Sequence, residues 1–229
     1  MVDNADPHRI PVMPVVSPAL KALSMSDPVR VGIIDHGSGN LHSARRALRQ
    51  VGAEVIVSND PSALLDTDAL VLPGVGALAA CMTGLRAMGG ARLVRQWVDE
   101  GRPLLGICVG HQMLFERGRE RDVDVKCLGV LPGVVEELPA ERLPHIGWNT
   151  VIPAADSALF QGVQERFYFV HSYGVVVTGP HDHFTTATHQ GATFVAAAEY
   201  GSVTSTQFHP EKSGTAGLAL LTRWLNQLS

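Results

Sequence analysis

The first half of the chain alternates short apolar runs with segments of helical periodicity, and this alternation constrains the fold more than any other feature. Four runs rich in β-branched and other apolar residues predict strands, at 31–35, 53–57, 69–72 and 103–107. Helices are predicted at 41–51, 78–88, 91–99 and 109–117. Strands that alternate with helices form parallel sheets covered on both faces. We therefore predict an α/β fold with three layers, a mostly parallel sheet flanked by helices.

The second half has a different pattern, because strand-like runs follow one another with few helical segments between them. These runs lie at 127–138, 145–151, 167–173, 193–200 and 203–208. Consecutive strands without crossover helices are typical of antiparallel pairing. We expect an antiparallel β extension folded against the parallel core, followed by a final helix at 215–228.

Residues 1–28 differ from the rest in composition, because they hold five of the 14 prolines. Proline fixes φ and lacks a backbone N–H, so this segment is neither a regular helix nor a central strand. Its acidic start and interrupted apolar part make a poor export signal. We expect a flexible N-terminal extension at 1–28 and one domain at 29–229, which is ample chain for a hydrophobic core.

Charge and cysteine content exclude several classes of protein. The balance of 18 Lys+Arg against 22 Asp+Glu provides no chain-wide basic field, so we expect no nucleic-acid partner. No uninterrupted apolar run reaches the ~18 residues of a membrane span. Three cysteines form no disulfide framework and suit a reducing compartment, so we expect a cytoplasmic protein. The low charged fraction of 17% permits a permanent partner surface, although a large core explains it equally well.

Cys108 stands in the sequence Gly106-Ile-Cys-Val-Gly110, after an apolar strand and before a helix. This is the pattern of a nucleophile elbow with sulfur in place of the serine oxygen. A sharp turn leaves little room beside the nucleophile, which explains the two glycines. The following helix directs its N-terminus at the sulfur and favours the reactive thiolate. The alternative is a small buried cysteine at a packed turn.

His209 and Glu211 follow another predicted strand, in Gln207-Phe-His-Pro-Glu211. In extended backbone, residues i and i+2 face the same side, so Glu211 can orient the imidazole of His209. His209 would then accept the proton of Cys108, as in a Cys-His-Glu triad. On its own, this segment also fits a surface turn. Together with the elbow at Cys108, it is better interpreted as part of a triad.

A glycine-rich loop, Pro73-Gly-Val-Gly76, ends the third predicted strand. Backbone N–H groups of Gly74 and Val75, with that of Val109, would form an oxyanion hole for a developing negative charge. The alternative is an ordinary strand-ending loop. No zinc ligand set stands out, and the loop at 37–40 lacks a phosphate-binding motif, so we predict neither a metal nor a cofactor.

The chain resembles the class I (triad-type) glutamine amidotransferases from about residue 30 to its C-terminus. The segments that carry the resemblance are Ile34-Asp-His-Gly-Ser-Gly-Asn-Leu41, Leu72-Pro-Gly-Val-Gly-Ala77, Gly106-Ile-Cys-Val-Gly-His-Gln112, Pro144-His-Ile-Gly-Trp-Asn149, Phe167-Tyr-Phe-Val-His-Ser-Tyr173 and Gln207-Phe-His-Pro-Glu-Lys-Ser-Gly214. Within the family, the first, fourth and last segments are most similar to glutaminase subunits of imidazole glycerol phosphate synthases. The resemblance implies a flavodoxin-like, class I amidotransferase fold.

The resemblance also implies a reaction. The thiolate of Cys108 attacks the side-chain amide of L-glutamine, a γ-glutamyl thioester forms, and ammonia leaves with a proton from His209. Water then releases glutamate. The ammonia passes to a cyclase subunit in a heterodimer. There a phosphoribulosyl-carboxamide intermediate becomes imidazole glycerol phosphate and aminoimidazole carboxamide ribotide, in histidine biosynthesis.

Further site residues follow from the same resemblance. Glutamine would be bound by residues of the glycine loop, the elbow helix, the acidic position beyond it and the opposite wall: Gly76, Gln112, Glu120, His171, Ser172 and Tyr173. The sequence around Glu120 departs from the family's more acidic run. Trp148, Asn149 and Lys212 would lie at the cyclase interface. The alternatives are a core aromatic for Trp148 and a solvated side chain for Lys212.

Two other functions remain open from the sequence. A free-standing γ-glutamyl hydrolase would need no partner and would be fully active alone. A catalytically idle regulatory homologue would have no chemical need for Cys108, His209 and Glu211 together, so the intact triad speaks against it.

Overall fold

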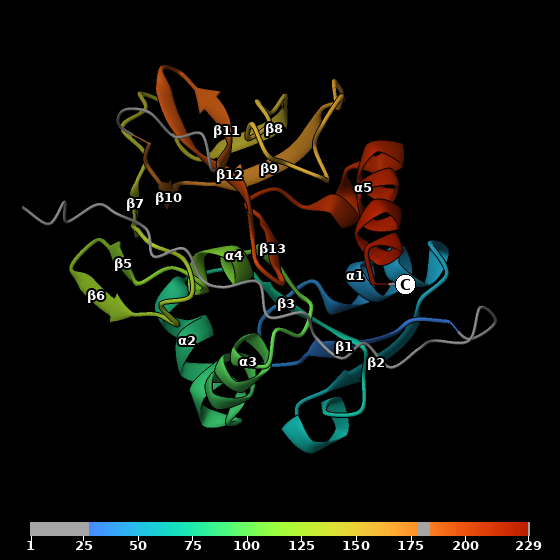
Figure 1. Cartoon of the computed structure of the whole chain (residues 1–229). Coiled ribbons are helices and arrows are strands. Elements are labelled where there is room, and N and C mark those ends of the chain that lie inside the picture. Colours follow the sequence, from blue (N-terminus) through green and yellow to red (C-terminus); the bar gives the residue numbers. More distant parts are fainter. Residues whose placement is uncertain (1–27, 178–183, 229) are drawn as a thin grey trace, which may run out of the picture.

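The computed structural model describes residues 28–177 and 184–228 (Figure 1). Nearly all of the predicted N-terminal extension lies outside these residues, as does the His-Asp-His segment at 181–183. Within the described ranges, no helix has the length and apolar character needed to cross a membrane.

A seven-stranded sheet forms the centre of the molecule, in the order β11-β12-β13-β4-β3-β1-β2. Its strands are β1 (Arg30–Ile34), β2 (Glu54–Ser58), β3 (Ala69–Gly74), β4 (Leu104–Cys108), β11 (Phe184–His189), β12 (Ala192–Tyr200) and β13 (Val203–Thr206). The five strands from β13 to β2 are parallel, and β12 and β11 add antiparallel pairs. Every residue of β3 and β4 is buried, as expected for strands covered on both faces.

Helices cover both faces of this sheet, which confirms the predicted three-layer α/β fold. They are α1 (Leu41–Gln50), α2 (Leu78–Ala87), α3 (Gly90–Asp99), α4 (Val109–Met113) and α5 (Gly214–Asn226), with short 3-10 turns η1 (Pro61–Leu64) and η2 (Pro210–Lys212). Figure 1 shows α1 beside α5 and α2 beside α3, as two groups on opposite sides of the sheet. Apolar side chains of both groups face the sheet and form one core.

Two smaller sheets complete the second half. One has the order β10-β7-β5-β6, and the other pairs β8 with β9. Their strands are β5 (Arg117–Glu120), β6 (Val123–Lys126), β7 (Val134–Glu137), β8 (His145–Asn149), β9 (Phe167–His171) and β10 (Tyr173–Val175). The expected antiparallel extension is present in the pairs β10–β7, β5–β6 and β8–β9, whereas β5 and β7 pair in parallel. The run at 203–208 differs, because β13 pairs in parallel with β4 and belongs to the core sheet.

Two local expectations were wrong, and they share one cause. The helix predicted at 109–117 ends at Met113, and the strand predicted at 127–138 is reduced to β7. Backbone N–H groups of residues 128–131 donate to the carbonyls of Met113, Leu114 and Phe115. Those carbonyls are therefore unavailable to continue the helix, and the donating segment is unavailable for a strand.

Candidate active site

Cys108 occupies a strained turn between β4 and α4. Its φ is +56°, in the left-handed region that residues with side chains rarely adopt. A Cβ on Gly106 would lie 2.7 Å from Leu114 Cδ1, and one on Gly110 would lie 1.8 Å from the carbonyl oxygen of Leu72. Gly110 is thus sterically required, as the elbow interpretation predicts, and a side chain at Gly106 would have to displace that of Leu114. The turn places the cysteine at the carboxyl end of a buried central strand.

His209 follows β13, the strand that pairs with β4, so the imidazole and the thiol lie at the same edge of the sheet. Its Nδ1 is 2.8 Å from Glu211 Oε1, and both side chains are only 2% exposed. This arrangement leaves Nε2 for the sulfur of Cys108. Burial opposes protonation, but the interactions with Cys108 and Glu211 outweigh it and raise the pKa of His209 to about 9. The imidazole therefore carries a proton at neutral pH and can act as a general acid.

A cavity of about 510 Å³ opens beside these residues. Its walls include most of the residues that the sequence singled out: Val75, Gly76, Cys108, Val109, Gln112, Glu120, His171, Ser172, Tyr173, His209 and Lys212. Gly74 and Glu211 line a closed crevice adjoining His209. The volume and the mixed lining suit a small polar molecule.

The glycine loop runs directly beside the nucleophile. Gly74 pairs with Cys108 in the register of β3 and β4. The carbonyl of Val75 accepts hydrogen bonds from Ser38 Oγ at 2.6 Å and from Cys81 Sγ at 3.3 Å. Gly76 has a φ of +86°, which permits the sharp turn after the strand. The side chains of Ser38 and Cys81 therefore fix the position of the loop next to Val109.

Glu120 lies in the cavity wall at the end of β5. Its Oε2 accepts a hydrogen bond of 2.9 Å from the backbone N–H of Leu78, at the start of α2. Burial raises the pKa of its carboxyl, against the lowering effect of the backbone hydrogen bonds. Backbone N–H groups of Leu78 and Ala79 thus fix the carboxylate in the cavity wall, where it can meet a positively charged group of a ligand.

The residues expected at an interface lie outside the cavity or at its mouth. Trp148 is 53% exposed on β8, and Ile146, two residues earlier on the same face, is 60% exposed. The alternative of a core aromatic is therefore wrong. Asn149 donates through Nδ2 to the carbonyl of Thr188 at 2.9 Å. Lys212 is exposed and lines the cavity, so it joins the pocket to the outer surface.

Several residues of the site were missed by sequence reasoning. Gly39, Asn40 and Val170 line the cavity. The segment that contains Gly39 and Asn40 carries the family resemblance, but nothing in it indicated that either residue lines the site. Gln207 is fully buried and its Nε2 lies 3.9 Å from Cys108 Sγ. Its position two residues before His209 was the available signal, since both face the same side of the chain.

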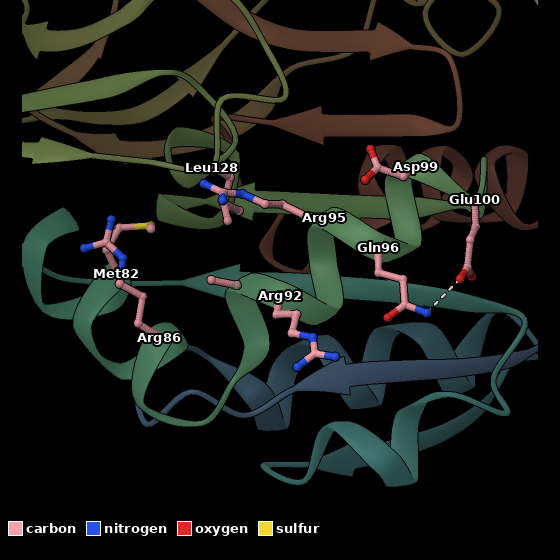
Figure 2. A pocket seen from close by; sticks show the side chains of 9 residues that line it. Met82, Arg86, Arg92, Arg95, Gln96, Asp99, Glu100 and Leu128 are labelled. Carbon is pink, nitrogen blue, oxygen red and sulfur yellow. Dashed lines mark hydrogen bonds between the residues drawn. The ribbon is translucent and has the colours of Figure 1, made fainter.

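Another cavity, of about 720 Å³, lies elsewhere, beside α2 and α3 (Figure 2). Its lining includes Arg86, Arg92 and Arg95, together with Asp99 and Glu100. None of the predicted catalytic residues reaches it, so it is not the site of the chemistry. Among the residues that the structure describes, no group of histidine, cysteine and acidic side chains could hold a metal ion.

Buried histidines around the site make the stability of the protein sensitive to acid. Burial lowers the pKa of His111 and of His171 to about 3. The unfolded chain binds these protons below its ordinary pKa of about 6.5, and the folded chain does not. The free energy of unfolding therefore falls as pH drops from 6.5. At pH 5 each of these two histidines lowers the free energy of unfolding by about 2 kcal/mol relative to neutral pH.

Urea unfolding at pH 7.5 and pH 5 measures this loss. In the variant His111→Asn, the free energy of unfolding should fall by about 2 kcal/mol less than in the parent between these two pH values. The exposed His42→Asn serves as a matched control and should retain the full drop. Equal pH dependence in His111→Asn and the parent chain would contradict a neutral, buried His111.

Comparison with known proteins agrees with this geometry. The family model of glutamine amidotransferase class-I matches residues 32–227. The imidazole glycerol phosphate synthase subunit HisH of Cutibacterium acnes is 97% identical over 205 residues, covering 90% of this chain and all of that protein. The protein of the same name from Thermobifida fusca is 54% identical, covering 87% of this chain and 99% of its own length.

Solved structures show the same fold. A glutamine amidotransferase crystal structure matches with a TM-score of 0.65 at 23% identity, covering 86% of this chain and 97% of its own. The structure of PurLQS from Thermotoga maritima also gives a TM-score of 0.65, at 19% identity, covering 89% of this chain and 100% of its own. The chain belongs to the class I glutamine amidotransferases and, within them, to the HisH subunits of imidazole glycerol phosphate synthase.

Proposed function

We propose that this chain is a glutaminase subunit that hydrolyses L-glutamine to glutamate and ammonia through a thioester on Cys108. The observation that carries the proposal is the meeting of Cys108, His209 and Glu211 at the edge of a cavity sized for one small molecule. Membership of the HisH subunits places the activity in histidine biosynthesis. The proposed location is the cytoplasm.

The first half-reaction begins with attack by the thiolate of Cys108 on the side-chain carbonyl carbon of glutamine. The developing oxyanion is stabilised by backbone N–H groups of the Gly74-Val75 loop and of Val109. The protonated His209 donates its Nε2 proton to the departing nitrogen, the C–N bond breaks, and ammonia leaves. Glu211 holds the imidazole in the required orientation through the 2.8 Å contact at Nδ1.

The second half-reaction consumes water. His209, now neutral, removes a proton from a water molecule that attacks the thioester carbonyl. The C–S bond breaks, glutamate forms, and the thiolate of Cys108 and the imidazolium of His209 are restored. Both steps are acyl transfers without any change of oxidation state, so the chemistry needs only these side chains and water.

Glutamine would be held by the walls of the cavity. Gly76 and Gln112 lie on the side of the glycine loop and elbow, with the segment from His171 to Tyr173 opposite. The carboxylate of Glu120, in the cavity wall, would meet the substrate's α-ammonium group. For a glutamine analogue without that amino group, we expect KM to rise much more than kcat falls, relative to glutamine.

The partner would be the cyclase subunit, which receives ammonia and forms imidazole glycerol phosphate and aminoimidazole carboxamide ribotide. The exposed apolar face of Ile146 and Trp148 supports this proposal, because exposed aromatic residues are common interface anchors. Lys212, at the cavity mouth, would form an ion pair across the interface. A free-standing hydrolase would have no use for this apolar face.

Isotope tracing tests ammonia transfer. The complex is supplied with glutamine labelled with nitrogen-15 in its amide, together with excess unlabelled ammonium. Label in the imidazole ring, undiluted by that ammonium, supports transfer between the subunits. Label diluted to the bulk ratio would contradict transfer and favour a free-standing hydrolase.

Interface variants provide a separate prediction. Trp148→Ala should weaken binding of the cyclase by about 30-fold, the typical effect of truncating a central aromatic anchor. Lys212→Ala should weaken binding less and should impair ammonia transfer. Isothermal titration with the cyclase measures the first effect, and exposed Leu65→Ala is the control. Unchanged affinity and normal transfer in both variants would place the interface elsewhere.

A further inference from the structure

The backbone carbonyl of Tyr173 lies at the centre of a buried chain of hydrogen bonds. It accepts from Gln112 Nε2 at 2.8 Å and faces His171 Nδ1 at 2.9 Å. A carbonyl oxygen can only accept, so both side chains must direct an N–H toward it. This one acceptor therefore fixes the amide orientation of Gln112 and the tautomer of His171.

The hydrogen bonds at the Tyr173 carbonyl also determine which end of the Gln207 amide faces Cys108. The remaining N–H of Gln112 donates to Gln207 Oε1 at 3.0 Å. Because Gln207 accepts through its oxygen, its NH₂ group must point the other way, and Nε2 lies 3.9 Å from Cys108 Sγ. Gln207 is 0% exposed, so no solvent competes for either end of its side chain.

The chain also continues away from the nucleophile, toward β8. With a hydrogen on Nδ1, a neutral His171 offers Nε2 as an acceptor to His145 Nδ1, 3.1 Å away. His145 Nε2 then faces Asn149 Nδ2 at 3.4 Å. Burial lowers the pKa of His171 to about 3 and that of His145 to about 4, so both stay neutral in single tautomers. Asn149 adjoins the exposed Trp148.

We propose that Gln207 is a positioning residue for the nucleophile, whose amide N–H, oriented by Gln112 and the Tyr173 carbonyl, donates to the sulfur of Cys108. An N–H donor stabilises the thiolate more than the thiol, because hydrogen bonds to charged acceptors are the stronger ones. This inference rests on the proposed role of Cys108.

The test measures the thiolate directly. The rate at which iodoacetamide alkylates Cys108 is followed by peptide mass spectrometry from pH 5 to 10, without glutamine or partner. In Gln207→Met, which keeps the length but removes the amide, the midpoint should rise by about one pH unit. The titratable groups that act on Cys108 or on the imidazole of His209 are unchanged in this variant: His209, Glu211, Cys81 and His171.

Steady-state kinetics of the complete complex supply a second measurement. Gln207→Met should lower kcat by about tenfold and leave the KM for glutamine nearly unchanged, because the sulfur and not the substrate loses a partner. Ser205→Ala is the matched control: it removes another buried hydrogen bond nearby in the chain, between Ser205 Oγ and His111 Nδ1. Its alkylation midpoint should equal that of the parent.

An unchanged midpoint in Gln207→Met would overturn the proposal. If that variant does not fold, Gln112→Met decides, since it frees the Gln207 amide to rotate and should raise the midpoint by a smaller amount. No shift in Gln112→Met would likewise overturn it. If the alkylation midpoint shifts but the protein forms no glutamate with any cyclase, Gln207 still donates a hydrogen bond to the thiolate. The proposed glutaminase function is then refuted instead.

Discussion

Replacing Cys108 with alanine is expected to abolish glutamine hydrolysis, lowering kcat by a factor of about 1,000 or more. Among the described residues that line the cavity, Cys108 is the only cysteine, and a thioester cannot form without its sulfur. Alanine accepts the φ of +56° at a strain similar to that of cysteine, so the elbow should keep its shape. Glutamate formation by the complex with the cyclase measures the effect.

The matched control for this variant is Cys127→Ala. Cys127 is also a buried free cysteine, and burial raises the pKa of its thiol to about 11, so it is a poor nucleophile. It lies outside the cavity that contains Cys108. The control should keep near-parental turnover. Turnover close to the parent in Cys108→Ala itself would contradict the thioester mechanism.

The variant Gly110→Ala is expected to lose its native structure. A methyl group there would lie 1.8 Å from the carbonyl oxygen of Leu72, in the centre of β3. Neither the strand nor the short helix can move without breaking the sheet, so the cost should exceed about 4 kcal/mol. Far-ultraviolet circular dichroism and urea unfolding measure the loss.

Gly174→Ala separates this clash from a general intolerance to alanine. Its added Cβ would meet its nearest neighbour, Leu138 Cδ2, at 3.5 Å, an ordinary contact distance. We expect a change of less than about 1 kcal/mol for this control. A folded Gly110→Ala with parental stability would show that the elbow is looser than the geometry requires.

Local sequence patterns predicted the parts of the fold that depend on local chemistry. The strands β1 to β4 and the helices α1, α2 and α3 follow from periodicity, and the elbow follows from Gly106 and Gly110. The strands β5 and β6 were not predicted, because Arg117–Glu120 is polar and Val123–Lys126 has only two valines in a short run. These strands are stabilised by pairing with each other, and β5 also pairs with β7. Such pairing is a property of the folded chain and is not apparent from the local sequence.

The same distinction applies to the site. Cys108, His209 and Glu211 stand in short motifs, so the sequence alone indicated their chemistry. Gln207 and His145 acquire their contacts from residues 95 and 26 positions away, Gln112 and His171, and no spacing rule shows this. The exposure of Trp148 was equally hidden, since β8 has the same alternation whichever face is covered.

Glutamate formation from glutamine by the purified chain, alone and with the cyclase loaded with its ligand, distinguishes a partner-controlled glutaminase from the alternatives. We expect slow hydrolysis by the chain alone and strong stimulation by the loaded cyclase. High activity alone that is indifferent to the cyclase would contradict partner control and indicate a free-standing hydrolase. Folded protein without activity in either condition would contradict the glutaminase assignment itself.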